Sequence, residues 1–195
     1  MRKERMTVNA ETDTELVHGE VLTSLETGTP TVVLVGPPGA GKTTVGRRLG
    51  RALNLPFVDS DVLIEHAEEK PCGEVYAELG EDAFRDLEVE FVKQALGRKG
   101  VVSLGGGAVI RPETRALLTQ HLVVWIDVGV EEGIRRTIGD GSRPVLAAEN
   151  PEERYRALLG EREPLYREVA DYRVRTDDRP PQRVVAEVLG VIDSE

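Results

Sequence analysis

Residues 36–43 read GPPGAGKT and match the pattern G-x-x-x-x-G-K-[ST] in full, between an apolar run and a helical pattern. In such a loop the glycines let backbone N–H groups turn toward phosphate oxygens, and the following helix adds its positive end. Lys42 would reach the β- and γ-phosphates, and the Thr43 hydroxyl would bind Mg²⁺. A glycine-rich turn without a ligand is the alternative, but the complete pattern in this position favours a nucleoside triphosphate site.

Two further short segments, one with two aspartates and one of three glycines, each follow a short apolar run. Asp59 and Asp61 flank Ser60, and three glycines occupy 105–107. Asp59 could orient water around Mg²⁺ while Asp61 faces an acceptor hydroxyl as base or hydrogen-bond acceptor; alternatively, Asp59 or Ser60 only caps a helix. Three glycines can bring backbone N–H groups close to an anion, or they can form a flexible turn.

Three arginines have types and positions suited to anion chemistry. Arg162 falls on the apolar stripe of its helical segment, in step with two tyrosines and two leucines, so it needs a buried anionic partner. Arg85 lies three residues before Glu88; it either forms a surface pair or joins Arg162 in clamping a carboxylate, oriented by Glu88. Arg143, in the loop 139–150, either closes over the γ-phosphoryl group or is a solvated loop charge.

The elements that position these residues alternate between short apolar runs and longer amphipathic stretches. Strands are predicted at 31–35, 56–58, 101–104, 121–128 and 171–175. Helices are predicted at 41–52, 130–138, 151–167 and 181–192, and a helical pattern that begins after 61 is strongest over 81–96. Alternation of this kind predicts an α/β fold with a parallel sheet of about five strands, covered on both faces and binding ligands beyond the carboxyl ends of its strands.

Composition narrows the class of protein. The chain of 195 residues carries 35 acidic and 25 basic residues, a formal charge of −10, which disfavours binding to nucleic acid or an anionic membrane. No apolar run approaches the ~20 residues of a membrane span. The lone cysteine, Cys72, excludes an internal disulfide and fits a reducing cytoplasm. Without a heptad or a large unexplained apolar face we expect a monomer.

The polar segment 1–29 is expected to be a leader, either disordered or one surface helix, ahead of a single domain at 30–195. A guanine-specific Asn-Lys pair occurs nowhere in the sequence, which argues against a GTPase switch. A kinase that acts on a small molecule or a nucleotide remains.

From about residue 31 onward, the chain resembles shikimate kinases of bacterial, actinobacterial type. The matching pieces are GPPGAGKTTVGRRL, DSD, GEDAFRDLE, SLGGGAV, SRP and REPLY, in the order of the family. The resemblance implies a three-layer P-loop kinase sandwich with a mobile lid at about 139–150 and substrate-binding helices at about 61–98. It also implies Mg²⁺-dependent phosphorylation of the 3-hydroxyl of shikimate by ATP, giving shikimate 3-phosphate and ADP.

Residue roles follow from the same resemblance. It assigns catalysis to Lys42, Asp61 and Arg143, and the metal to Thr43, with Asp59 acting through water. It assigns ATP binding to Gly39, Ala40, Gly41, Lys42, Thr43, Thr44, Arg136, Arg143, Arg179 and Pro181. It assigns shikimate binding to Asp61, Tyr76, Phe84, Arg85, Gly106, Gly107 and Arg162.

Three features depart from the family pattern: the leader, EKPC at 69–72 in place of a Gly-x-Ser-Ile type of turn, and Tyr76 in place of a more usual Phe. Two alternative functions stay open. A gluconate-type or nucleoside monophosphate kinase would not explain an inward arginine together with three glycines. A non-catalytic ATP-binding regulator would lack catalytic groups, yet Lys42, Asp61 and Arg143 are present.

Overall fold

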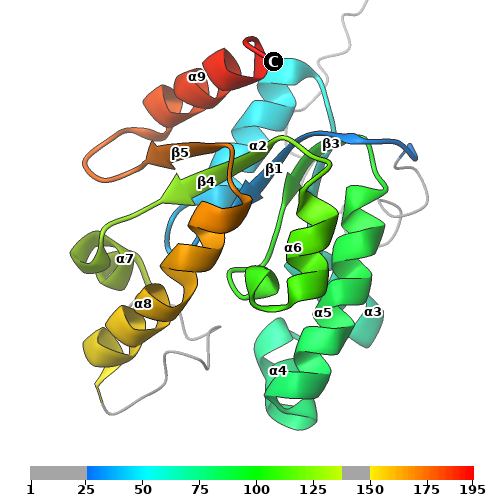
Figure 1. The fold of residues 1–195 in the computed structure, drawn as a ribbon, viewed down its shortest axis with the longest axis vertical. Helices are drawn as coiled ribbons and strands as arrows, with labels where there is room; N and C mark the ends of the chain where they lie inside the picture. The colour runs from blue at the N-terminus through cyan, green and yellow to red at the C-terminus, as the bar shows by residue number, and fades with distance from the viewer. Residues whose placement is uncertain (1–25, 138–149) are drawn as a thin grey trace, which may run out of the picture.

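A five-stranded parallel sheet organises the computed structural model, which describes residues 26–137 and 150–195. The strands run in the order β2-β3-β1-β4-β5 (Figure 1). Their bounds are Pro30–Val35 (β1), Phe57–Asp59 (β2), Gly100–Ser103 (β3), Val123–Asp127 (β4) and Tyr172–Arg175 (β5). Because the pairs are parallel, the carboxyl ends of the strands meet at one edge of the sheet. The predicted α/β class and strand number are confirmed.

Helices cover both faces of this sheet (Figure 1). They are α2 (Lys42–Leu53), α3 (Ser60–Glu68), α4 (Cys72–Leu79), α5 (Glu81–Leu96), α6 (Pro112–Leu118), α7 (Val130–Thr137), α8 (Pro151–Val169) and α9 (Pro181–Ile192), with a 3₁₀ turn at Ala108–Ile110. The sequence prediction missed α6 and did not separate α4 from α5.

The continuous apolar strands form two cores, one on each face. In β1, Val33 and Val35 pack with α5, α6 and α8, whereas Val32 and Leu34 pack with α2 and α9. This alternation follows from the two-residue period of a strand, and burial on both faces explains why the run TVVLV contains no polar side chain except Thr31. The described helices include none that is both long and apolar enough to cross a membrane.

Local chemistry sets several helix boundaries near the sheet edge. Gly41, at φ 91°, occupies the N-cap of α2 in a left-handed conformation that glycine adopts readily. Asp59 caps α3 by accepting a hydrogen bond from the backbone N–H of Asp61 at 3.1 Å. Between α3 and α4, Glu69 is left-handed at φ 54° and Pro71 precedes the first turn, so EKPC forms a tight helix-to-helix connection.

The described part of the N-terminal segment lies against the loop between α5 and β3. Thr27 forms an antiparallel bridge with Arg98, and Glu26 pairs with Lys99 at 2.7 Å. Residues 1–25 lie outside the described residues, so the leader expected at 1–29 and the domain boundary at 30 stay predictions.

Candidate functional site

The loop 36–43 follows β1 directly and leads into α2, as its pattern predicts. Lys42 Nζ donates hydrogen bonds to the carbonyl oxygens of Gly36 at 2.8 Å and Pro37 at 3.2 Å. The lysine therefore folds back over the loop, and its ammonium group lies beside the backbone that would surround a phosphate. Gly36 approaches β4 so closely that a Cβ there would overlap the carbonyl oxygen of Ile126. Only glycine fits at that point.

Asp59 links the phosphate loop to the end of β2. One of its carboxylate oxygens accepts a hydrogen bond from the Thr43 hydroxyl at 3.1 Å, and the other accepts the backbone N–H of Asp61. The cap and the contact with Thr43 thus coexist, although the sequence analysis treated a cap and a functional role as alternatives. Asp61 Oδ1 lies close enough to Gly105 that a Cβ on this glycine would overlap it. Strands β2 and β3 therefore bring Asp61 and the glycine loop together.

A cavity of about 150 Å³ opens between these loops and helices α4, α5 and α8. Ten of the predicted site residues line it: Lys42, Thr43, Asp59, Asp61, Tyr76, Phe84, Arg85, Gly106, Gly107 and Arg162. The phosphate loop, the paired aspartates and two arginines therefore share one chamber at the carboxyl edge of the sheet. Such a chamber can hold a small polar molecule beside the end of a triphosphate.

Two guanidinium groups and one carboxylate are buried in the wall of this cavity. The exposed fractions are 5% for Arg85, 2% for Glu88 and 7% for Arg162, and Arg85 Nη1 lies 2.7 Å from Glu88 Oε2. The predicted burial of Arg162 is confirmed, and the surface-pair interpretation of Arg85 is wrong. Two buried guanidinium groups thus lie beside the buried carboxylate of Glu88, and Arg85 Nε also lies 4.0 Å from the exposed carboxylate of Glu81. Two guanidinium groups in one wall can bind an anion that enters the cavity.

The electrostatics of the cluster reflect this burial. Burial raises the pKa of the Glu88 carboxyl group, and the neighbouring Arg85 opposes the rise. Burial likewise lowers the pKa of the Arg162 guanidinium. The Nε atoms of both arginines are buried and have no hydrogen-bond partner among the described residues, so each guanidinium retains donor capacity.

Aromatic rings and a glycine hold Arg85 in place. Its guanidinium carbon lies 5.5 Å from the ring centre of Phe84 and 5.8 Å from that of Tyr76, within cation–π range. The two rings pack edge to face with centroids 5.3 Å apart. A Cβ on Gly107 would overlap the Arg85 guanidinium, so the glycine loop can approach the arginine only without a side chain.

Side chains from helices α3 and α8 hydrogen-bond to the backbone of the glycine loop, residues 105–107. Gly105 N–H donates to the Ser60 hydroxyl at 3.0 Å, while the carbonyl oxygen of Gly106 accepts from Arg162 at 3.1 Å and from the Tyr166 hydroxyl at 2.5 Å. The sequence analysis considered Ser60 only as a helix cap and assigned no role to Tyr166. The shared helical stripe of Arg162 and Tyr166 was the one signal that could have pointed to the tyrosine.

Cys72 also lines the cavity, through its position at the start of α4. Its thiol donates to the carbonyl oxygen of Asp61 at 3.3 Å. Burial and the nearby carboxylate of Asp61 raise the pKa of the thiol, which makes it a poor nucleophile. Cys72 therefore packs and donates a weak hydrogen bond.

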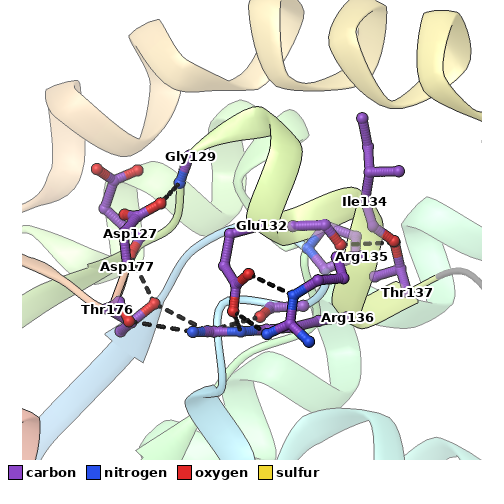
Figure 2. Close-up of polar contacts among 12 residues, drawn as sticks. Asp127, Gly129, Glu132, Ile134, Arg135, Arg136, Thr137, Thr176 and Asp177 are labelled. Carbon is purple, nitrogen blue, oxygen red and sulfur yellow. Dashed lines mark hydrogen bonds and ion pairs between the residues drawn. The ribbon is translucent and has the colours of Figure 1, made fainter. Parts of the chain in front are cut away.

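A second cavity, of about 460 Å³, lies on the other side of the phosphate loop. The predicted nucleotide residues that line it are Ala40, Gly41, Thr44, Arg136, Arg179 and Pro181. Figure 2 shows Arg136 bonded to Glu132 and to the Thr176 hydroxyl, at distances of 2.6 Å and 3.1 Å. Arg136 also donates to the carbonyl oxygen of Gly39 at 3.3 Å, and this bond ties the cavity to the loop. Hydrogen bonds from Arg135 and Arg136 lower the pKa of Glu132 to about 2.

Arg143 lies outside the described residues, as does the lid predicted at 139–150 apart from Asn150. The role of Arg143 therefore stays a prediction.

Comparison with known proteins agrees with this geometry. The family model for shikimate kinase matches residues 38–193. A shikimate kinase of Corynebacterium efficiens is 62% identical over 85% of this chain and 98% of its own length, and one of Corynebacterium glutamicum is 63% identical over 82% and 95%. The structure of the shikimate kinase from Acinetobacter baumannii in complex with shikimate superposes with a TM-score of 0.81 at 39% identity, over 89% of this chain and 97% of that one.

Likeness to kinases of other specificity is weaker. A gluconokinase from Sinorhizobium meliloti shares 17% identity at a TM-score of 0.50, which shows only a common fold. The match to the family model and the identity with the corynebacterial enzymes are far more specific. The chain belongs to the shikimate kinase family.

Proposed function

We propose that this protein transfers the γ-phosphoryl group of ATP to the 3-hydroxyl of shikimate, giving shikimate 3-phosphate and ADP. The observation that carries the proposal is the buried cluster of Arg85, Glu88 and Arg162 in the same cavity as Lys42 and Asp61. Its two buried guanidinium groups suit a carboxylate, and the phosphate loop beside them suits a triphosphate. The names of the relatives support the same reaction.

The acid substrate would be held at one end of the cavity. Arg85 and Arg162 would bind the shikimate carboxylate, together with the backbone around Gly106 and Gly107, and the rings of Tyr76 and Phe84 would line the ring of the substrate. Burial of both arginines strengthens such charge-assisted bonds because little water competes for them. The acceptor hydroxyl would then face Asp61.

The nucleotide would occupy the rest of the sheet edge. Backbone N–H groups of residues 39–44 would surround its phosphates, and Lys42 would exchange its carbonyl partners for phosphate oxygens. Arg136, Arg179 and Pro181 line the second cavity and would enclose adenine. Arg143 would neutralise charge on the transferred group, so that transfer depends mainly on positioning and charge rather than on covalent chemistry.

The oxygen donors at the end of β2 fit Mg²⁺. The Thr43 hydroxyl and the Asp59 carboxylate lie 3.1 Å apart, and both are hard oxygen ligands of the kind that this cation prefers. We infer that Thr43 ligates the metal directly and that Asp59 holds one of its waters. When bound, the cation would neutralise charge on the phosphates.

Asp61 would receive the proton that leaves the shikimate hydroxyl as its oxygen attacks the γ-phosphorus. In this step the new P–O bond forms and the bond to the β-γ bridging oxygen breaks, so that ADP departs with the electron pair. In a loose transition state the proton can leave late, so Asp61 need not be a strong base. Its carboxylate must instead lie close to the hydroxyl.

A coupled assay of ADP release tests the proposal. ATP, Mg²⁺ and shikimate should give turnover, whereas gluconate or a nucleoside monophosphate in place of shikimate should not. Well-folded protein without shikimate-dependent turnover would reject the function, and ATP binding without any turnover would favour the non-catalytic regulator. As part of the same proposal we place the enzyme in the cytoplasm as a monomer. Light scattering of the purified chain would check the monomeric state.

A further inference from the structure

Helix α8 carries two buried tyrosines on the same face as Arg162. Tyr155 and Tyr166 are both 0% exposed, and their separation of 11 residues along the helix corresponds to about three turns. Each hydroxyl donates to one loop carbonyl at the sheet edge: Tyr155 to Pro38 at 2.8 Å, and Tyr166 to Gly106 at 2.5 Å. Helix α8 therefore forms hydrogen bonds to both the phosphate loop and the glycine loop.

A hydrogen bond to a carbonyl oxygen also orients the next N–H group. Because a trans peptide is planar, the C=O of Pro38 and the N–H of Gly39 point in opposite directions in one plane. The same holds for the C=O of Gly106 and the N–H of Gly107. By holding these carbonyl oxygens toward α8, the two hydroxyls turn the N–H groups of Gly39 and Gly107 away from it.

The packing around the rings leaves the hydroxyls little freedom. Tyr155 packs with Ile134 and Leu159, and its hydroxyl fits against α7 because a Cβ on Gly133 would overlap it. The ring of Tyr166 packs on Trp125 with centroids 5.8 Å apart. A phenylalanine ring would fill either apolar site equally well. A buried hydroxyl is unfavourable unless it forms a hydrogen bond, so these two hydroxyls contribute through their bonds to the loop carbonyls.

We propose that Tyr155 and Tyr166 are positioning residues with separate duties: Tyr155 orients the phosphate loop for the nucleotide, and Tyr166 orients the glycine loop for the acid. The assignment to substrates rests on the function proposed above. Gly106 has a second donor in Arg162, whereas the structure gives the Pro38 carbonyl no second side-chain donor among the described residues. Loss of the hydroxyl at 155 should therefore have the larger effect.

The test compares Tyr155→Phe and Tyr166→Phe with the unchanged enzyme. For Tyr155→Phe we expect a rise of about tenfold in the KM for ATP and in the Kd for ADP, equivalent to about 1.4 kcal/mol, with the KM for shikimate within about twofold. For Tyr166→Phe we expect a rise of roughly threefold to tenfold in the KM for shikimate, with the Kd for ADP within about twofold. The matched control is Tyr172→Phe, because that hydroxyl bonds Glu195 at the protein surface and its loss should change neither constant.

A merely structural role would change both substrates together. Equal changes in both constants for either variant, or no change beyond that of the control, would overturn the proposal. Calorimetry with ADP alone keeps the test of Tyr155 separate from the identity of the acid, because absence of shikimate turnover in the unchanged enzyme would reject only the proposed function. Two-dimensional ¹H–¹⁵N NMR spectra give a second measurement for Tyr155→Phe. The backbone amide signal of Gly39 should shift, and that of Gly107 should not.

Discussion

Replacing Arg162 by methionine distinguishes the contribution of this side chain to substrate binding from its contribution to stability. The side chain stays unbranched and flexible, but it becomes shorter and loses its charge, its hydrogen bond to Gly106 at 3.1 Å and its share of the anion site. If Arg162 binds the carboxylate, removing it should cost at least about 2 kcal/mol of substrate binding, roughly a 30-fold rise in the KM for shikimate. The KM for ATP should change by less than about threefold, because the hydrogen bond of this side chain goes to the glycine loop and not to the phosphate loop.

The stability of the Arg162→Met variant should change little or increase, although its substrate binding weakens. In the unliganded protein Arg162 is a buried charge whose pKa is lowered by burial, and Glu88, a carboxylate that acts on it, already pairs with Arg85. Losing the bond to Gly106 costs about 1 kcal/mol, whereas replacing a buried charge by an apolar side chain is often neutral or stabilising by about 1–4 kcal/mol. We therefore expect the unfolding free energy to stay within about 1 kcal/mol of its original value or to rise.

Steady-state kinetics and thermal unfolding measure the two quantities on one preparation. Arg167→Met is the matched control, because Arg167 lies on the same helix but its side chain is 68% exposed and pairs with Glu163 at 2.8 Å at the surface. That variant should change neither KM. An unchanged KM for shikimate in Arg162→Met, or a rise confined to ATP, would refute the assignment of the carboxylate to this side of the cavity.

Three further perturbations probe other parts of the site. Asp61→Asn should lower kcat by about 10²–10⁴-fold while the Kd for ADP, measured by calorimetry, stays the same; loss of both would contradict its role toward the acceptor hydroxyl. Gly107→Ala should raise the KM for shikimate by about tenfold or more, since the new methyl group overlaps the Arg85 guanidinium, and an unchanged KM would show that this close approach is dispensable. The pKa of Glu132 falls from 4.5 to about 2 in the folded protein, so its bonds to Arg135 and Arg136 stabilise the fold above about pH 4.5 and are lost as pH falls toward 2. Unfolding curves between pH 2 and 6 should therefore be less pH-dependent for Glu132→Gln, and identical curves would contradict the pairing.

The sheet and the phosphate loop were predictable because local patterns determine them. The run TVVLV is continuous and β-branched, which predicts a strand buried on both faces, and the complete motif after it predicts a loop that presents its backbone to phosphate. The stripe of α8 likewise predicted the burial of Arg162. Helix α6 was missed because its seven residues are too few to show a clear period.

Contacts between distant residues were not predictable in the same way. A pair such as Arg85 and Glu88 has the same spacing on an exposed helix face and in a core, so only the fold reveals its burial. The bond from Tyr155 to Pro38 joins residues 117 positions apart, and nothing in either local sequence indicates it. Such contacts depend on how α8 crosses the sheet edge, which helical periodicity does not specify.

A crystal structure with ADP and shikimate bound would test the central claim most directly. We predict the shikimate carboxylate between Arg85 and Arg162, the 3-hydroxyl within hydrogen-bond distance of Asp61, and the β-phosphate of ADP beside Lys42. Shikimate bound outside the cavity, or with its carboxylate turned away from both arginines, would contradict the account.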